Sequence, residues 1–189
     1  MNTAVQTERK ATGTGTWTID GAHSTAEFAV KHMMVSTVKG RFTNLTGTLH
    51  IDDANPEASR IEASIDVASV DTGAEQRDEH LGSDDFFNAA RYPQIRFRST
   101  GISGKGDDWK MDGELTIRDV TKPVTLDVTF SGTAKDPWGN TKAGFRLTGT
   151  INRYDFGLKW NKALEAGGVL VSEDVTITGV LQLARAEVQ

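Results

Sequence analysis

A cluster of charged residues near the middle of the chain contains the groups best suited to chemistry. Arg77, Asp78, Glu79 and His80 follow one another, and on a helix Arg77 and His80 share a face with Leu81. Two groups that can carry positive charge beside an apolar side chain suit a polar or anionic head group whose tail enters an apolar space. The alternative is that Arg77 pairs with a nearby carboxylate and only pins the helix in place.

Other titratable residues give weaker candidates for a metal or catalytic site. His23, His32 and His80 could bind a metal only with a bulge, because the nine-residue gap places the first two on opposite faces of a regular strand. Asp84 and Asp85 are adjacent and therefore point apart, which argues against an acid/base pair. The chain has no cysteine, nucleophile elbow, P-loop, dinucleotide fingerprint or HExxH motif. We therefore expect no metal, no cofactor and no catalytic residue.

The charged cluster belongs to a segment that predicts one short helix, over residues 73–81. Thr72 and Glu75 have the spacing of a capping box, and Gly82 stands where a helix commonly ends. Isolated helices shorter than about 12 to 15 residues are marginal in water. This helix must therefore dock on the rest of the protein. A second helical turn or two is expected over residues 161–168.

Alternation of apolar and polar residues predicts strands over most of the remaining chain. Ala26, Phe28, Val30 and His32 fall on one face of such a strand, which we expect to point inward. About eight strands follow at hairpin spacing without βαβ alternation, so the sheet should be antiparallel and close into a barrel. Many inward positions are small, which favours a cavity. Glycines at bulges and corners of a packed barrel would give the same pattern.

Length and charge limit the domain organisation and the partners. The 189 residues predict one domain, a barrel over residues 15–189 preceded by a polar, flexible tail over residues 1–14. The net charge of -5 argues against nucleic acid or an anionic membrane surface as partner. No segment is apolar enough to span a membrane as a helix, and the first residues lack the apolar region of a signal peptide. A cytoplasmic location is therefore expected.

Four blocks, in this order, carry a family signature. They are WTIDGAHSTAEFAVKHMMVSTVKGRF (residues 17–42), RDEHLGSDDFFNAARYP (77–93), GELTIRDVTKPVTL (113–126) and INRYDFGLKWN (151–161). Together they resemble the YceI-like family of lipocalin-like, polyisoprenoid-binding proteins. Asp119 and Ser172 stand where that family commonly has glycine, so these departures concern turns rather than strands.

The resemblance implies an all-β fold, a single eight-stranded antiparallel lipocalin-like barrel with a short helix beside or over one end. It also implies an elongated apolar cavity for a long isoprenoid or fatty chain, such as an isoprenoid quinone or a polyprenyl phosphate. The positions that match the family make His32, Arg77 and His80 candidates for the polar end of the site. The candidates for its apolar lining are Phe28, Val30, Phe42, Phe86, Phe97, Leu115, Leu126 and Phe145.

Three hypotheses for function follow from these observations. The leading one is non-enzymatic binding, transport or storage of a long apolar isoprenoid-type or lipid ligand. The second is an enzyme in which His32, Arg77 and His80 act on a phosphorylated or carbonyl substrate inside the barrel. The third is a packed barrel without a cavity that serves as an interaction module, with a homodimer as the expected assembly.

Overall fold

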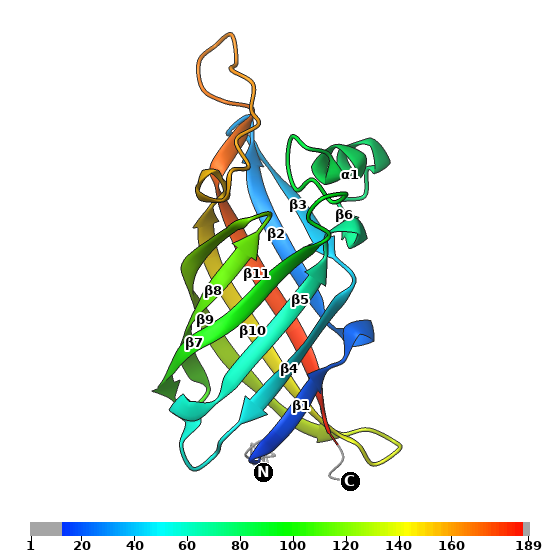
Figure 1. Cartoon of the computed structure of the whole chain (residues 1–189), viewed down its shortest axis with the longest axis vertical. Coiled ribbons are helices and arrows are strands. Elements are labelled where there is room, and N and C mark those ends of the chain that lie inside the picture. The colour runs from blue at the N-terminus through cyan, green and yellow to red at the C-terminus, as the bar shows by residue number, and fades with distance from the viewer. Residues whose placement is uncertain (1–12, 187–189) are drawn as a thin grey trace, which may run out of the picture.

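Antiparallel strands form most of the computed structural model, which describes residues 13–186 (Figure 1). The tail expected over residues 1–14 lies almost entirely outside these described residues. The strands are β1 Gly15–Ile19, β2 Thr25–His32, β3 Ser36–Phe42, β4 Leu45–Ile51, β5 Arg60–Asp66, β6 Val70–Asp71, β7 Gln94–Lys105, β8 Asp108–Ile117, β9 Val120–Lys135, β10 Thr141–Asn152 and β11 Val171–Arg185. The helices are α1 Glu75–Gly82 and the 3-10 helices η1 Gly21–His23, η2 Pro56–Ala58, η3 Val67–Ser69 and η4 Arg153–Phe156.

The barrel closes through eight strands in the order β1-β4-β5-β7-β8-β9-β10-β11, because β11 also pairs with β1. Every strand pairing of residues 13–186 is antiparallel. β2 continues β1 along β11, β3 pairs with β2, and β6 pairs with β3. The segments β1/β2, β3/β4 and β5/β6 are therefore three bent strands. The predicted eight-stranded antiparallel barrel is confirmed.

The two ends of the barrel differ. We call the end that carries α1 the upper end, and the end where β1 begins and β11 finishes the lower end (Figure 1). The lower half has a packed core around Trp17 and Leu183, both fully buried. A second apolar cluster lies at the upper end and includes Phe42, Phe86 and Phe156. Successive side chains of a strand point to opposite faces of the sheet, and the apolar ones point inward here, so both clusters lie inside the barrel.

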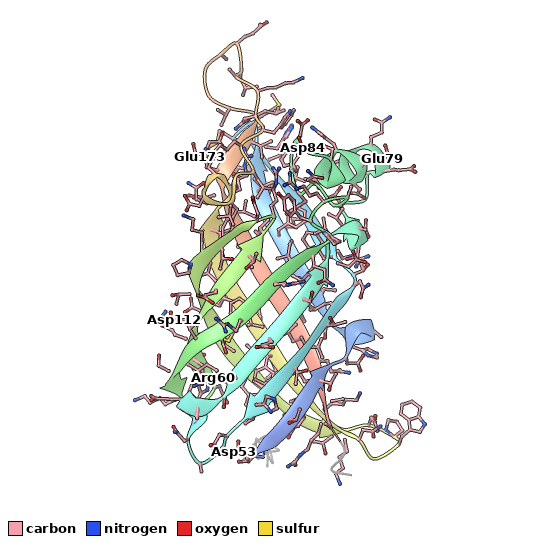
Figure 2. All side chains as sticks on the ribbon, viewed as in Figure 1. Asp53, Arg60, Glu79, Asp84, Asp112 and Glu173 are labelled. Carbon is pink, nitrogen blue, oxygen red and sulfur yellow. The ribbon has the colours of Figure 1, made fainter. Side chains whose placement is uncertain are left out.

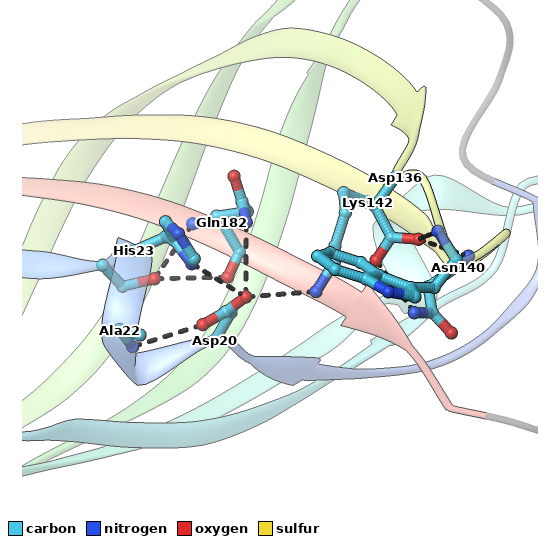
Figure 3. A network of polar contacts seen from close by, with 9 residues as sticks. Asp20, Ala22, His23, Asp136, Asn140, Lys142 and Gln182 are labelled. Atoms are coloured by element: carbon cyan, nitrogen blue, oxygen red, sulfur yellow. Dashed lines mark hydrogen bonds and ion pairs between the residues drawn. The ribbon is translucent and has the colours of Figure 1, made fainter.

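The junction between β1 and β2 is a break in the ladder stabilised by a polar network (Figure 3). The Asp20 carboxylate accepts the N–H of Ala22 at the start of η1 and contacts His23, Lys142 and Gln182. Burial of this carboxylate alone would raise its pKa, but the hydrogen bonds from Lys142, His23 and Gln182 lower it to about 2. The network therefore joins η1 to β10 and β11 across the break.

Helix α1 begins two residues later than the capping-box spacing predicts. Its N-cap is Ala74, which makes no side-chain cap. Thr72 instead gives both its N–H and its hydroxyl to one oxygen of Asp78, at 2.9 and 2.6 Å. The predicted capping box with Glu75 is therefore wrong, because Asp78 accepts the Thr72 N–H in place of Glu75, and the Thr72 hydroxyl donates to Asp78 instead of accepting a helix N–H.

The segment before β11 also differs from the expectation. No helix forms over residues 161–168; that stretch makes a small hairpin closed by a bridge between Ala163 and Val169. A 3-10 helix, η4, forms earlier, where Asn152 caps the N–H of Tyr154 and Gly157 takes a left-handed conformation at φ 80°.

Candidate ligand-binding cavity

An apolar cavity of about 480 Å³ occupies the upper half of the barrel. Its floor consists of side chains that also belong to the packed lower core, among them Met111, Leu126 and Leu181. Its upper border comes from α1, from the segment after it, and from the connection between η4 and β11. The volume falls within the range of about 300 to 1,000 Å³ that is typical of small-molecule sites.

Ten of the eleven residues that the sequence nominates for the site border this cavity. Phe145 does not: it faces inward below the floor, where its ring lies 5.2 Å from that of Phe130 in the lower core. The ten residues, contributed by five strands, α1 and the segment after it, are Phe28, Val30, His32, Phe42, Arg77, His80, Phe86, Phe97, Leu115 and Leu126.

A row of aromatic side chains forms one wall. The rings of Phe28 and Phe42 are 5.7 Å apart, and Phe87 meets Phe42 edge-on at 5.6 Å. Phe28 lies across Gly40, its cross-strand partner, so closely that a Cβ on Gly40 would be 2.4 Å from the Phe28 ring. Because Gly40 has no side chain, there is room for the Phe28 ring to lie against the wall. The ring therefore does not fill the cavity.

The upper border is built around His80. Its imidazole lies edge-on to the rings of Phe86 and Trp160, at 5.1 and 4.7 Å, and its Nε2 is 2.8 Å from the carboxylate of Asp85. Trp160, which the sequence interpretation did not select, thus connects α1 with the far side of the barrel end. Figure 2 shows the side chains that crowd this end, with Asp84 and Glu79 pointing outward.

Arg77 borders the cavity but directs its guanidinium to Thr72, in the segment just before its own helix. Its Nε donates to the hydroxyl of Thr72 at 2.8 Å, and its Nη2 donates to the Thr72 carbonyl at 3.0 Å. This geometry matches the alternative in which Arg77 pins the helix, although its partner is Thr72 rather than a carboxylate.

Arg153, not selected from the sequence, is the buried cation of this site. It is 5% exposed, and within residues 13–186 no carboxylate forms an ion pair with it. Its guanidinium donates to the carbonyls of Leu158, Trp160, Val171 and Ser172, at 2.6 to 3.2 Å. Burial lowers the pKa of this side chain. The sequence signal was its place in the INRYDFGLKWN block, at the end of an inward-facing strand.

The histidines do not meet. His23 contacts Asp20, His50 contacts the hydroxyl of Thr16 at 2.9 Å, and His80 contacts Asp85. Within residues 13–186, no three histidine, aspartate or glutamate side chains are grouped as metal ligands would be. In that same part of the chain, none of the helices has the length and apolar character needed to cross a membrane.

An antiparallel barrel of eight strands with a helix at one end and an apolar interior defines a lipocalin-like fold. The match to a family model is more specific: the YceI-like domain covers residues 17–183, so the chain belongs to the YceI-like family. Protein YceI of Escherichia coli O17:K52:H18 is 42% identical over 140 residues, which are 74% of this chain and 73% of that protein.

Solved structures agree with this assignment. Burkholderia cenocepacia BcnA shares the fold with a TM-score of 0.76 and 25% identity, over 87% of this chain and 98% of that one. The YCEI protein of Campylobacter jejuni is 33% identical with a TM-score of 0.71, over 83% and 90% of the two chains. A polyisoprenoid-binding domain from Saccharophagus degradans has the same fold, with a TM-score of 0.64 and 19% identity, over 90% and 98%.

Proposed function

We propose that this protein binds a long apolar chain of the isoprenoid or lipid type in its barrel and carries or stores it without chemical change. The observation that carries the proposal is the cavity of about 480 Å³, whose walls and floor are almost entirely aliphatic and aromatic. The S. degradans domain of the same fold is described as polyisoprenoid-binding, which supports the ligand class. An isoprenoid quinone, a polyprenyl phosphate and a fatty chain all meet the requirement for a slender apolar tail.

Affinity in such a site accumulates along the chain. At about 25 cal/mol per Å² of apolar surface, each buried isoprene unit contributes on the order of 1 to 2 kcal/mol before the cost of association. The depth of the cavity therefore selects the length of the tail, whereas the upper border selects the head group.

The polar residues of the upper border support binding rather than turnover. The hydrogen-bonding groups of Arg77, His80 and Arg153 point to Thr72, to Asp85 and to backbone carbonyls. These contacts hold α1 and the loop before β11 in place. A packed interaction module would have no cavity, and this barrel has one. The homodimer and the cytoplasmic location expected from the sequence stay predictions.

Solvent extraction of the purified protein, followed by mass spectrometry, tests the proposal. We expect a long-chain lipid at a fixed stoichiometry, and we expect Phe28→Asp to abolish it because the variant places a charge on the cavity wall. Trp138→Ser, on the exposed turn between β9 and β10, is the matched control and should retain the lipid. Full occupancy in a folded Phe28→Asp variant would contradict the proposal. Turnover of the extracted lipid that His80→Ala abolishes without loss of binding would establish an enzyme instead.

A further inference from the structure

Exposed apolar side chains gather at the upper end of the barrel. Met33, Met34 and Val35, in the turn between β2 and β3, are 45%, 65% and 84% exposed, and Val169, in the loop before β11, is 37% exposed. These four belong to a group of only six large hydrophobic side chains that are exposed in residues 13–186. A hydrogen bond of 2.8 Å from the N–H of Met33 to the carbonyl of Leu170 joins the two segments. We call residues 33–35 and 163–170 together the apolar rim.

The residues of the β2–β3 turn are not the ones that its backbone conformation favours. Met33 and Met34 both have left-handed φ angles, 52° and 62°, and the N–H of Val35 donates to the carbonyl of His32. The β-turn from His32 to Val35 has Met33 and Met34 at its two central positions, and a turn with left-handed angles at both prefers Asn and Gly there, since bulky residues are strained. The two methionines therefore cost the fold free energy in strain and again in exposure to water. A contact that covers them would recover the second cost.

The other half of the rim is a hairpin that stands beyond the barrel end (Figure 1). Leu164 exchanges backbone hydrogen bonds with Gly167 and Gly168, and the N–H of Leu170 donates to the carbonyl of Lys162. Arg153 and Asn161 fix the base of the hairpin through the carbonyl of Val171. Leu170 and Val171 also line the cavity, so the rim is continuous with the cavity wall.

Charges around the rim are balanced. Three exposed cations and two exposed anions flank it along the chain, namely Lys31, Lys159, Lys162, Glu173 and Asp174, and a third exposed anion, Glu165, lies within its hairpin. With a net charge of -5, the whole protein has no general attraction to an anionic surface. Two small projecting tips suit a deformable apolar partner better than a rigid protein face, which would need a flat or grooved surface.

We propose that the apolar rim is a membrane-docking surface, whose tips enter the interfacial region of a neutral lipid bilayer and place the upper end of the barrel against it. Methionine and valine side chains bind such a surface by burial of apolar area, without a requirement for anionic lipid. This proposal goes beyond ligand binding and does not depend on it. It names the surface at which an apolar molecule could pass between membrane and barrel without crossing water.

Co-sedimentation of the full chain with phosphatidylcholine vesicles tests the proposal. We expect measurable partitioning of the wild type and a loss of about tenfold in the double variant Met33→Asn/Met34→Gly, which removes the apolar side chains while supplying the residues that the turn prefers. Thermal unfolding of this variant should occur at the same or a higher temperature. Trp138→Ser removes an 83% exposed side chain at the opposite end and should leave partitioning unchanged.

Several results would overturn the proposal. They are no partitioning of the wild type onto phosphatidylcholine, equal partitioning of the double variant, an equal loss in Trp138→Ser, and binding that requires added phosphatidylglycerol. A dimer that the double variant dissociates in sedimentation velocity would assign the rim to a second copy of the chain. Lipid extraction from the same variants separates the two proposals, because the double variant leaves the cavity lining intact and should keep its bound chain.

Discussion

At the scale of single residues, Arg153 explains how the upper end is held together. A buried guanidinium usually has a carboxylate partner, whereas this one is satisfied by four carbonyl oxygens from residues 158 to 172. Because its planar group donates in several fixed directions, it can bind both ends of the loop before β11 at the same time. It also lines the apolar cavity, so its positive charge lies at the border of that cavity.

Asp20 predicts a pH dependence of stability. Its pKa is lowered from 3.8 to about 2 in the folded protein, so the contribution is fully present above pH 4 and is lost as the pH falls toward 2. We expect Asp20→Asn to lower the free energy of unfolding at pH 7 by about 1 to 2 kcal/mol, since solvent screens part of the interaction. Urea titrations at pH 7, 5, 3 and 2 should show this difference shrinking at the acidic end.

The matched control for this prediction is Asp119→Asn, on the exposed turn between β8 and β9. It should follow the wild type at every pH. A constant difference between Asp20→Asn and the wild type from pH 7 to pH 2 would show that the Lys142 and Gln182 contacts do not act through the charge of Asp20.

The position of a single residue was predictable from the sequence only in two cases. Either its contacts come from residues close along the chain, or the alternation of the strand determines which way it faces. Phe28 and Val30 line the cavity as the period-two pattern indicates. Arg153 was missed because its acceptors are backbone carbonyls, which no residue type signals. Phe145 has the correct inward face, but the height of the cavity floor depends on how the larger side chains pack below it.

At the scale of elements, α1 is a docked helix of eight residues that is too short to be stable alone. Thr72 connects it to the end of β6 through both Asp78 and Arg77. His80 connects it to Trp160 on the other side of the barrel end. The helix therefore acts as a bridge across the upper border, consistent with the predicted position beside or over one end.

The pairing of β2 with β3 predicts the effect of one methyl group on the cavity. Gly40→Ala would place a Cβ 2.4 Å from the ring of Phe28, and the empty space beside that ring lets it swing inward. We expect the free energy of unfolding to fall by about 1 to 2 kcal/mol, and the amount of bound chain to fall much more. Denaturant titration and lipid extraction of the same preparation measure the two effects.

Gly101→Ala, in β7, is the control for this prediction. Its Cβ would meet nothing nearer than an oxygen of Asp112 at 4.0 Å, so neither stability nor bound lipid should fall. Normal lipid content in Gly40→Ala would mean that Phe28 moves away from the cavity instead of into it.

Alternation predicted the strands well because one face of each strand is buried along nearly its whole length. It did not predict the break at residues 21–23, which depends on Asp20, Lys142 and Gln182 meeting from three distant segments. One or two helical turns were expected over residues 161–168, where the structure has the start of the hairpin at residues 163–170. Its glycines, Gly167 and Gly168, take left-handed φ angles of 87° and 92°, which turn the chain back instead.

At the scale of the whole molecule, the barrel is packed in one half and hollow in the other. Trp17 and Leu183 are fully buried in the lower half, where β1 closes the ring against β11 and β4. The upper half surrounds the cavity and is completed by α1 and the loop before β11. We therefore expect the lower half to contribute more of the stability, which leaves the upper half free to admit a ligand.

This division predicts which parts of the barrel lose stability when a bound chain is removed. A ligand present at 100 times its dissociation constant stabilises the folded state by about 3 kcal/mol, so the delipidated protein should unfold at a lower denaturant concentration. Amides that exchange by global unfolding should lose that same amount everywhere. Amides of β2, β3 and α1 that exchange by local opening should lose up to that same amount, because opening at the cavity border releases the chain, whereas local openings in β1 should lose little. Hydrogen exchange of both forms measures this, with β1 as the internal control. A loss for local openings in β1 equal to that in β2 would show that the barrel responds as one unit, and the lower half would then not be an independent foundation for the cavity.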